Sequence, residues 1–471
     1  MLKPHQFSEE VKPIIEWMDN YMKNIESYPV RSQAKPREIF DSIPDGIPEK
    51  PESMLSVLSD LNEKIMPGVT HWQHPSFHAY FPCSNSIESI FAEMVMATMG
   101  IQGMIWETSP AAAELEEKML DWLKVAMKLP NSWKGVIQDS ASSSTLVAIL
   151  TAREVKTNFE SNKKGVPNNL RVYCSEEVHS SIEKGVKIAG IGSDNLVKIK
   201  TDDQMAIIPS ELEKAINNDL AHGFVPCCVI GAFGTTGTMG MDPVRAIGEI
   251  CQKHNVWYHV DAAYAGTALL LPEYHWMAEG MELADSFVFN PHKWMFTNFD
   301  CSCYYVKDTE VLKKTFEIMP EYLKTDTTEA INNYRDWGIP LGRRFRALKL
   351  WFVMRGFGLE GIQGKLRNDI ALNTDFANKL KERNDFELMV KPMFNMTCFR
   401  YKPKGFDDLE ELNQLNKAIR DHINDSGKAY ITHTMIDGIY TLRFLPAATY
   451  IEKRHVDDFY ELLVTTILVV H

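Results

Sequence analysis

The residue with the clearest chemical potential in this sequence is Lys293. It lies in the stretch SFVFNPHKWMF, residues 286–296, with His292 beside it and apolar residues on both sides. Burying an amine is costly unless the amine is paired or used chemically. A lysine at such a position most often lies in a surface turn. Residues elsewhere in the chain are therefore needed to distinguish a surface lysine from a buried one that is paired or used chemically.

Other polar side chains follow apolar runs that have the length of strands. The stretch DSASSST, residues 139–145, opens a helical run, and small hydroxyl residues with free backbone N–H groups at a helix start suit a phosphate. An ordinary helix cap needs only one such residue. His179, Thr236 and Asp261 follow three further runs. Alone, His179 is typical of a surface residue, and Asp261 suits either a helix cap or a partner for a buried cation.

Together these residues predict one site. The carboxyl ends of strands in one sheet would bring together a phosphate cradle, a carboxylate, a histidine, hydroxyls and a lysine. Pyridoxal 5′-phosphate (PLP) has the matching groups, namely a phosphate, a basic ring nitrogen and an aldehyde. Lys293 would form a Schiff base with the aldehyde, and Asp261 would pair with the ring nitrogen.

The elements expected to position this site alternate between strands and helices from about residue 110. The candidate strands are short and apolar, and helical patterns separate most of them. This pattern predicts an α/β fold with a mostly parallel central sheet buried on both faces. The candidate strands are Gly135–Gln138, Leu170–Cys174, Cys227–Phe233, Val256–Val260, Ser286–Phe289 and Cys301–Val306.

The two ends of the chain differ from this middle part. Residues 6–27 have apolar residues at helical spacing, and helix-like segments recur near 52–66 and 86–98. After about residue 365 come a helix, two strand-like runs, a second helix, a hairpin candidate around the Asp-Gly pair at 437–438 and a last helix. The tail therefore predicts a smaller α/β domain.

Composition argues against several classes of function. The net charge of −13 opposes nucleic acid or an anionic membrane surface as the main partner. The eight cysteines do not form two CxxC pairs, so we expect no metal site, and they are typical of buried thiols in a reducing compartment. No charged and then apolar leader opens the sequence, so we expect a cytoplasmic location. Neither GxGxxG nor GxxxxGK[ST] follows a strand, which opposes nucleotide binding.

Three motifs carry a family resemblance that covers almost the whole chain. They are HVDAAYAG at 259–266, NPHKW at 290–294 and LGRRFRALKLWFVMRG at 341–356. Together they closely resemble the aromatic L-amino acid decarboxylases, in the group II PLP-dependent decarboxylases of the aspartate aminotransferase-like fold (PLP fold type I). The resemblance implies a carboxy-lyase that converts an aromatic L-amino acid to its amine and CO2.

The resemblance implies catalytic roles for four residues. Lys293 would hold PLP, and Asp261 would keep the ring nitrogen protonated, so that the ring withdraws electrons. His179 would stack on the ring face and help to orient the substrate. Tyr322, in a polar loop, would protonate the carbon atom from which CO2 has left.

The resemblance also implies two sets of binding residues. Those expected to contact PLP are Ser140, Ala141, Ser142, His179, Thr236, Asp261, Ala263, Asn290, His292 and Lys293. Those expected to form the substrate pocket, which both subunits of a homodimer share, are Trp72, Tyr80, Phe81, Pro82, Arg335, Gly342 and, from the other subunit, Met104 in the segment 102–104. Aromatic walls suit an aromatic substrate side chain.

Gly342 bears on the choice of substrate. It matches a position that is glycine in indole-accepting and broad aromatic enzymes and serine in many tyrosine- and histidine-selective relatives. Glycine leaves room for a bicyclic ring. We therefore expect tryptophan or 5-hydroxytryptophan first, with Dopa, tyrosine or phenylalanine as further candidates.

Tyr322 bears on the type of reaction. Relatives with phenylalanine at this position tend to release aldehydes, so Tyr322 together with His179 favours plain decarboxylation. The alternatives within enzymes are an aromatic aldehyde synthase, which Tyr322 opposes, and a histidine or glutamate decarboxylase, which Gly342 opposes. An alternative from another class is a PLP-binding protein without turnover.

Four residues depart from the family pattern. Asp139 stands where many relatives have glycine, directly before the phosphate turn, and a negative charge there is unfavourable unless it points away or pairs. Ser143 replaces a common glutamate, Met104 a phenylalanine and Cys83 a threonine. We expect these changes to affect substrate ranking more than cofactor binding.

The expected organisation has three parts: an N-terminal helical segment, 1–85, a large PLP-binding domain, 86–362, and a small C-terminal α/β domain, 363–471. In the family the first segment packs against the partner subunit and makes the dimer obligate. The acidic polar face of its helix, which includes Glu9, Glu10 and others, favours this dimer contact over a membrane surface.

Overall fold

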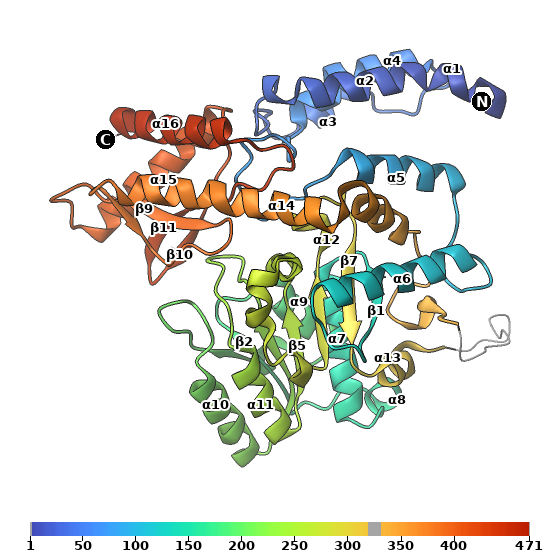
Figure 1. The fold of residues 1–471 in the computed structure, drawn as a ribbon, viewed down its shortest axis with the longest axis vertical. Coiled ribbons are helices and arrows are strands. Elements are labelled where there is room, and N and C mark those ends of the chain that lie inside the picture. The colour runs from blue at the N-terminus through green and yellow to red at the C-terminus, as the bar shows by residue number, and fades with distance from the viewer. Residues whose placement is uncertain (1, 319–330, 471) are drawn as a thin grey trace. The chain divides into compact units, whose positions relative to one another are not determined.

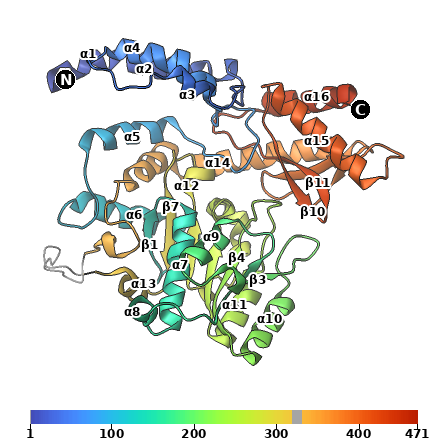
Figure 2. The same cartoon turned by 180° about the vertical axis from the view of Figure 1, so that it is seen from behind.

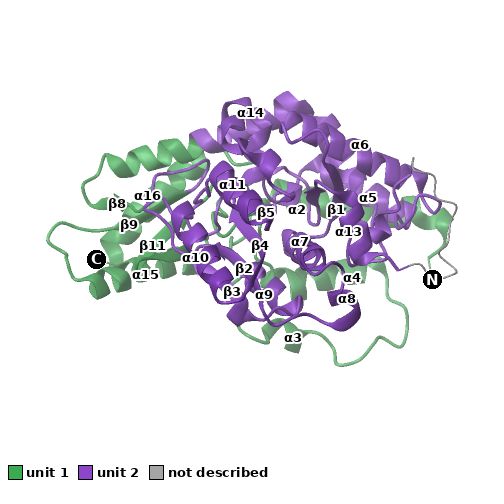
Figure 3. Ribbon diagram, turned by 90° about the horizontal axis from the view of Figure 1, so that it is seen from below, with its two compact units in different colours: residues 1–82, 372–389, 397–471 green, residues 83–371, 390–396 purple. Residues whose placement is uncertain are grey.

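The computed structural model describes residues 2–318 and 331–470, which form two compact units (Figure 3). Unit 1 comprises residues 1–82, 372–389 and 397–471, and unit 2 comprises residues 83–371 and 390–396. Most of both predicted end segments belongs to unit 1. The division into the three parts 1–85, 86–362 and 363–471 itself stays a prediction.

Unit 2 is built on a seven-stranded sheet in the order β1-β7-β6-β5-β4-β2-β3 (Figure 1). Five strands, from β6 to β3, run parallel, and β7 is antiparallel to both of its neighbours. The predicted α/β fold with a mostly parallel sheet is thereby confirmed. The strands are β1 Lys134–Gln138, β2 Leu170–Ser175, β3 Leu196–Ile199, β4 Val225–Ala232, β5 Trp257–Asp261, β6 Ser286–Phe289 and β7 Ser302–Val306.

Helices cover both faces of this sheet, which explains why its strands are almost continuously apolar. Helix α7 is in front of the strands in Figure 2, whereas α6 and α11 are in front of them in Figure 1. All four residues of β6 and seven of the eight in β4 are buried. The helices are α5 Ile87–Met99, α6 Pro110–Ala126, α7 Ala141–Lys156, α8 Ser161–Lys164, α9 Ser181–Ile188, α10 Pro209–Ala221, α11 Val244–His254, α12 Pro291–Trp294 and α13 Thr309–Phe316, followed by α14 Ala347–Lys381.

The sequence pattern identified six of the seven strands and missed β3. Strand β3 lies at the edge of the sheet, pairs only with β2, and has one buried residue, Ile199. An edge strand needs no continuous apolar run, because one side of it remains open to water. Its four residues, LVKI, therefore lack the continuous apolar run by which the other strands were identified.

Unit 1 contains a four-stranded antiparallel sheet in the order β10-β11-β9-β8. Asp437 and Gly438 have φ angles of 48° and 79° and form the two-residue turn between β10 and β11, so the predicted hairpin is confirmed. The elements are β8 Phe386–Leu388, β9 Thr397–Tyr401, α15 Leu409–Asp425, β10 Thr432–Ile436, β11 Ile439–Phe444 and α16 Lys453–Val470.

The N-terminal helices of unit 1 are short and largely exposed. Helices α1 Phe7–Glu10, α2 Lys12–Lys23, α3 Glu38–Ser42 and α4 Met54–Asp60 contain no buried residue. Apolar side chains such as Phe7, Ile15, Met22, Phe40 and Leu55 are among the exposed ones. Helices that face only solvent rarely expose this much apolar surface.

The remaining features of composition have structural counterparts. All eight cysteines are unbridged thiols, and every one except Cys83 is buried, as expected. Within residues 2–318 and 331–470, no helix has the length and apolar character that crossing a membrane requires. The long helix α14 Ala347–Lys381 has a kink at Gly358, whose φ is 67°.

Candidate active site

Lys293 lies on the short helix α12, directly after strand β6. Asn290 follows the strand as the N-cap of the helix, Pro291 starts the helix, and the Lys293 N–H donates to the Asn290 carbonyl at 3.0 Å. Burial lowers the pKa of Lys293, and the nearby Asp261 and Cys83 oppose this shift. A lowered pKa leaves more of the amine neutral, which is the form that attacks a carbonyl carbon.

Asp261 ends the neighbouring parallel strand β5. Its Oδ1 accepts the Ala263 N–H at 3.1 Å, which fixes the carboxylate at the start of the following turn. Burial raises the pKa of Asp261, whereas Lys293, the Ala263 N–H and His179 lower it. The predicted carboxylate, amine and imidazole therefore lie within one electrostatic environment at the carboxyl ends of the strands.

His179 follows β2 at the same edge of the sheet. Its Nδ1 lies 2.8 Å from the Ser181 hydroxyl and accepts the Ser181 N–H at 3.1 Å, while the residue keeps contact with solvent. Partial burial, and then the charge of Lys293, lower the pKa of His179. The ring is therefore neutral at pH 7, and a neutral imidazole can lie flat on an aromatic ring.

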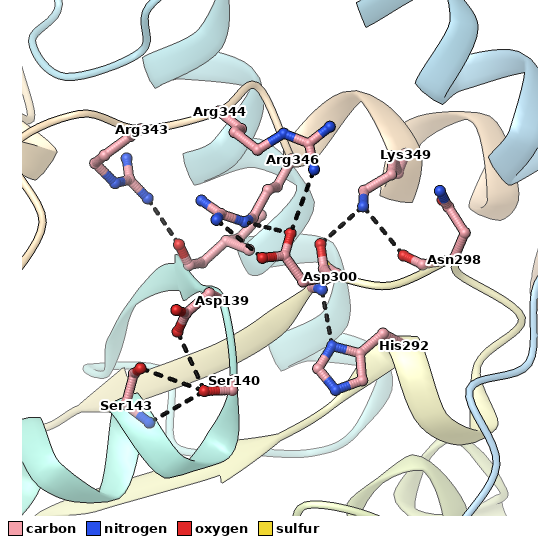
Figure 4. Close-up of polar contacts among 12 residues, drawn as sticks. Asp139, Ser140, Ser143, His292, Asn298, Asp300, Arg343, Arg344, Arg346 and Lys349 are labelled. Atoms are coloured by element: carbon pink, nitrogen blue, oxygen red, sulfur yellow. Dashed lines mark hydrogen bonds and ion pairs between the residues drawn. The ribbon is translucent and has the colours of Figure 1, made fainter. Parts of the chain in front are cut away.

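The predicted phosphate cradle is the N-terminus of α7. Ser140 caps this 16-residue helix, and its Oγ accepts the Ser143 N–H at 3.2 Å (Figure 4). Ala141 and Ser142 occupy the first turn, where backbone N–H groups have no partner inside the helix. The Ser142 side chain is exposed and makes no hydrogen bond within the described chain. These are the features that bind an anion at a helix start.

The remaining predicted cofactor residues lie on the segments that carry these groups. Asn290 is 2% exposed, and its Oδ1 has no hydrogen-bond partner among the described residues. The Ala263 carbonyl accepts the Asn290 N–H at 3.0 Å, and Thr236 lies half-buried after β4. The Nδ1 of His292 accepts the Cys301 N–H at 2.8 Å, so this buried ring supports the turn before β7.

These residues fit PLP, because a buried amine and a buried carboxylate lie at the same edge of the sheet as a free helix N-terminus. Lys293 would hold the aldehyde carbon, Asp261 the ring nitrogen, and the α7 N-terminus the phosphate. Bound PLP supplies an electron-withdrawing ring. Residues 2–318 and 331–470 contain no cluster of three or more His, Cys, Asp or Glu side chains suited to a metal ion.

The predicted substrate residues fall into two groups, one in each unit. In unit 2, the Arg335 N–H donates to the Met104 carbonyl at 2.9 Å, and the buried Arg335 side chain contacts Asp336. Nearby, the Arg343 N–H donates to Gln102 Oε1 at 2.6 Å. The segments around Met104 and Gly342 are thus joined on this chain, which the sequence did not predict.

Gly342 lies directly against Gln102. A Cβ atom at position 342 would come within 3.0 Å of Gln102 Nε2, which is tighter than ordinary contact. Gln102 is exposed, so its side chain can move. A larger residue at 342 would therefore have to displace Gln102.

The second group of predicted substrate residues lies in unit 1. Trp72 and Tyr80 stack with ring centroids 5.8 Å apart, and the Tyr80 hydroxyl lies 3.2 Å from that of Tyr430. Phe81 and Pro82 are buried. Tyr322, the predicted proton donor, lies outside the described residues.

An ionic network that the sequence did not predict lies beside the cradle, as Figure 4 shows. Arg346 forms two hydrogen bonds with Asp300, at 3.0 and 3.1 Å. The buried Lys349 donates to the carbonyls of Asn298 and Asp300. Arg343 contacts Glu116 at 2.6 Å. The partners are far apart in sequence, so no spacing could have indicated the pairs.

Comparison with known proteins agrees with this geometry. The family model for the pyridoxal-dependent decarboxylase conserved domain matches residues 36–402. Tyrosine decarboxylase 2 of Narcissus pseudonarcissus is 40% identical, over 97% of this chain and 93% of its own length. Phenylacetaldehyde synthase of Arabidopsis thaliana is 39% identical, over 98% and 96%. The crystal structure of Oryza sativa TDC with PLP and tryptamine matches with a TM-score of 0.96 at 33% identity, over 99% of both chains.

These matches confirm the predicted fold type, the cofactor and the enzyme class. Tyrosine decarboxylases, tryptophan decarboxylases and aldehyde synthases match to similar extents, so they show the family without selecting one substrate. The chain belongs to the PLP-dependent decarboxylases, within the family of aromatic amino acid decarboxylases.

Proposed function

We propose that this enzyme decarboxylates an aromatic L-amino acid to its amine and CO2, with tryptophan or 5-hydroxytryptophan as the preferred substrate. Dopa, tyrosine and phenylalanine are further candidates. The observation that carries the proposal is the grouping of Lys293, Asp261 and His179 at the carboxyl ends of strands in one sheet.

Each of these residues has a distinct task in the proposed reaction. The Lys293 amine holds the cofactor until the amino group of the substrate replaces it. Asp261 holds a proton at the ring nitrogen, because a carboxylate next to a cation favours the charged form. His179 covers the ring face and positions the substrate carboxylate. Tyr322 then gives a proton to the carbon that has lost CO2.

Gly342 and the aromatic residues support an aromatic substrate with a large ring. The solved relative with tryptamine bound is consistent with an indole product. We propose that the substrate pocket is shared between subunits and includes Trp72, Tyr80, Phe81, Pro82, Met104, Arg335 and Gly342. The same proposal assigns PLP contacts to Ser140, Ala141, Ser142, Thr236, Ala263, Asn290 and His292.

A panel of aromatic amino acids, with each amine product measured, tests the substrate proposal. We expect the highest kcat/KM for tryptophan or 5-hydroxytryptophan. Gly342→Ser should lower kcat/KM for tryptophan by roughly tenfold or more and that for tyrosine by less, because a filled pocket excludes the bicyclic ring.

The matched control is the double variant with Gln102→Ala, because Gln102 contacts position 342. If Gln102→Ala restores tryptophan turnover in the Gly342→Ser protein, displaced Gln102 was the obstacle. Equal losses for tryptophan and tyrosine in the single variant would refute a selective role for Gly342.

An aromatic aldehyde synthase is the second candidate, because phenylacetaldehyde synthase is among the similar relatives. Tyr322 favours decarboxylation over this reaction, since its hydroxyl can protonate the carbanion before oxygen reacts with it. The wild-type enzyme should release amine without peroxide, and Tyr322→Phe should shift the products to aldehyde, ammonia and peroxide. Peroxide from the wild-type enzyme would favour the second candidate.

We also propose a cytoplasmic homodimer, in which residues 1–85 wrap the partner. The exposed apolar side chains of α1, α2 and α4 support this proposal. Light scattering should give twice the chain mass. A mixture of refolded Lys293→Ala and Tyr322→Phe chains should regain decarboxylation if Tyr322 of one chain serves the site of the other, whereas inactive mixed dimers would show that each chain uses its own Tyr322.

A further inference from the structure

Asp139 places a carboxylate at the entrance of the phosphate cradle. It follows strand β1 and directly precedes Ser140, the cap of α7, and it is half-buried (Figure 4). From the sequence alone, this charge could either point away from the cradle or pair with another group. Its carboxylate faces the cradle, because Asp139 Oδ1 accepts a hydrogen bond from Ser140 Oγ at the start of α7.

The Ser140 hydroxyl is the contact through which Asp139 affects the cradle. Ser140 Oγ donates toward Asp139 Oδ1 at 3.2 Å and lies at the same distance from Ser143 Oγ. A serine hydroxyl has one proton, so it donates fully to one acceptor at a time. A phosphate oxygen at the helix start would have to take this proton from Asp139.

The charge of Asp139 is also not neutralised by an ion pair within the described chain. Arg346, on which the charge of Asp139 acts, is engaged elsewhere, since its guanidinium forms two hydrogen bonds with Asp300. Burial alone would lower the pKa of Arg346, but Asp300, with weaker contributions that include Asp139, raises it. Asp139 thus lies in the field of Arg346 without being its main partner.

We propose that Asp139 weakens the binding of the cofactor phosphate, both by competing for the Ser140 hydroxyl and by repelling the phosphate charge. The proposal rests on the assignment of the α7 N-terminus as the phosphate cradle. It reverses the expectation from sequence that Asp139 affects substrate ranking more than cofactor binding. The consequence is that the loaded fraction of enzyme depends on the supply of PLP.

The direct test is the dissociation constant of PLP from the apoenzyme, measured by absorbance or tryptophan fluorescence. Asp139→Asn keeps the shape of the side chain and removes its charge, and Asp139→Gly removes both. We expect both variants to bind PLP about tenfold more tightly, the size of one moderately screened charge contact. PLP binding in both variants that is no tighter than in the wild-type enzyme would overturn the proposal.

Two controls show whether the effect is directed at the phosphate. Pyridoxal lacks the phosphate, so Asp139→Asn should leave its dissociation constant unchanged, and an equal gain for pyridoxal would contradict the proposal. Asp203→Asn removes the same charge from an exposed position after β3, the strand at the opposite edge of the sheet from β1. It should leave PLP affinity unchanged.

Ser142→Ala separates the proposal from the assignment on which it rests. If the cradle is assigned correctly, this variant should weaken PLP binding several-fold and leave pyridoxal binding unchanged. Unchanged PLP affinity would refute the cradle and the proposal with it. Weaker PLP binding in Ser142→Ala, without tighter binding in the Asp139 variants, would refute the role of Asp139 alone.

Discussion

Lys293 and Asp261 control each other's protonation. Burial disfavours the charged form of both groups, while each one's charge favours that of the other. The lysine therefore reaches its neutral, nucleophilic form at a lower pH than an exposed lysine does. In the proposed reaction, the same carboxylate would be free to pair with the cofactor ring once the amine has reacted.

Asp261→Asn separates these two tasks of the carboxylate. Loss of the negative charge should lower the pKa of Lys293 further, because Asp261 is the first group that raises it. The pH profile for labelling of Lys293 in the apoenzyme by an amine-specific reagent, read by mass spectrometry, should then shift to lower pH. Decarboxylation should fall by about a hundredfold or more. A shift of the labelling profile to higher pH would contradict the pairing.

The proposed reactive residues could be picked out from the sequence because each one follows an apolar run. Lys293, Asp261 and His179 end or follow strands, and residues at the carboxyl ends of parallel strands converge. The contact of Ser181 with His179 could have been predicted from the sequence, since a serine often forms a hydrogen bond with the residue two positions before it. The pair of Arg346 and Asp300 was not, because the two residues meet only through the fold.

At the scale of elements, two aromatic residues join the segments that carry Asp261 and Lys293. Tyr264, in the segment after β5, stacks on Trp294 with ring centroids 5.1 Å apart and an interplanar angle of 2°. Trp294 Nε1 donates at 3.0 Å to Asp369, a fully buried carboxylate on α14. Helix α14 therefore fixes the position of Trp294, the residue next to Lys293.

Asp369→Ala should destabilise the protein and loosen the cofactor. Asp369 also accepts from Lys365 at 2.8 Å, so its removal leaves a lysine and an indole N–H without their buried partner. We expect the free energy of unfolding to fall by about 2–4 kcal/mol. Arg367→Ala on the same helix breaks an exposed ion pair with Glu273 and should have a much smaller effect. Equal losses in denaturant titrations would refute the role of Asp369.

Most elements could be predicted because a buried parallel sheet leaves continuous apolar runs, as in β4 and β6. The hairpin around Asp437 and Gly438 was predictable from its turn residues. Strand β3 was not, because an edge strand with Lys198 in it has too little apolar character. The joining of Met104 to Arg335 also depends on the fold, since no local signal brings loops so distant in sequence together.

At the scale of the whole molecule, stability should depend on neutral histidines in the core of unit 1. His78 is fully buried, with ring centroids 4.5 Å from Phe444 and 5.1 Å from Phe459. Burial lowers the pKa of His78 to about 3 and that of His74 to about 4. In the unfolded chain both rings have a pKa of about 6.5.

Acid should therefore unfold this protein steeply. Above pH 6.5 both states hold the rings neutral, and below it only the unfolded chain takes up the protons, so stability falls as the pH falls toward 4. The free energy of unfolding should decrease by about 1.4 kcal/mol per pH unit for each histidine. His78→Phe should reduce this slope, and replacing the exposed His5 should not. An unchanged slope for His78→Phe would contradict the burial argument.

The covalent attachment of PLP at Lys293 is the central claim, and borohydride reduction of the holoenzyme tests it most directly. Reduction should fix the cofactor to the peptide that contains Lys293, and Lys293→Ala should abolish the label. Lys349 is the matched control, since it is also buried and its amine donates to two carbonyls, so Lys349→Met should keep the label on Lys293. A reduced cofactor on any other lysine, or on none, would contradict the account.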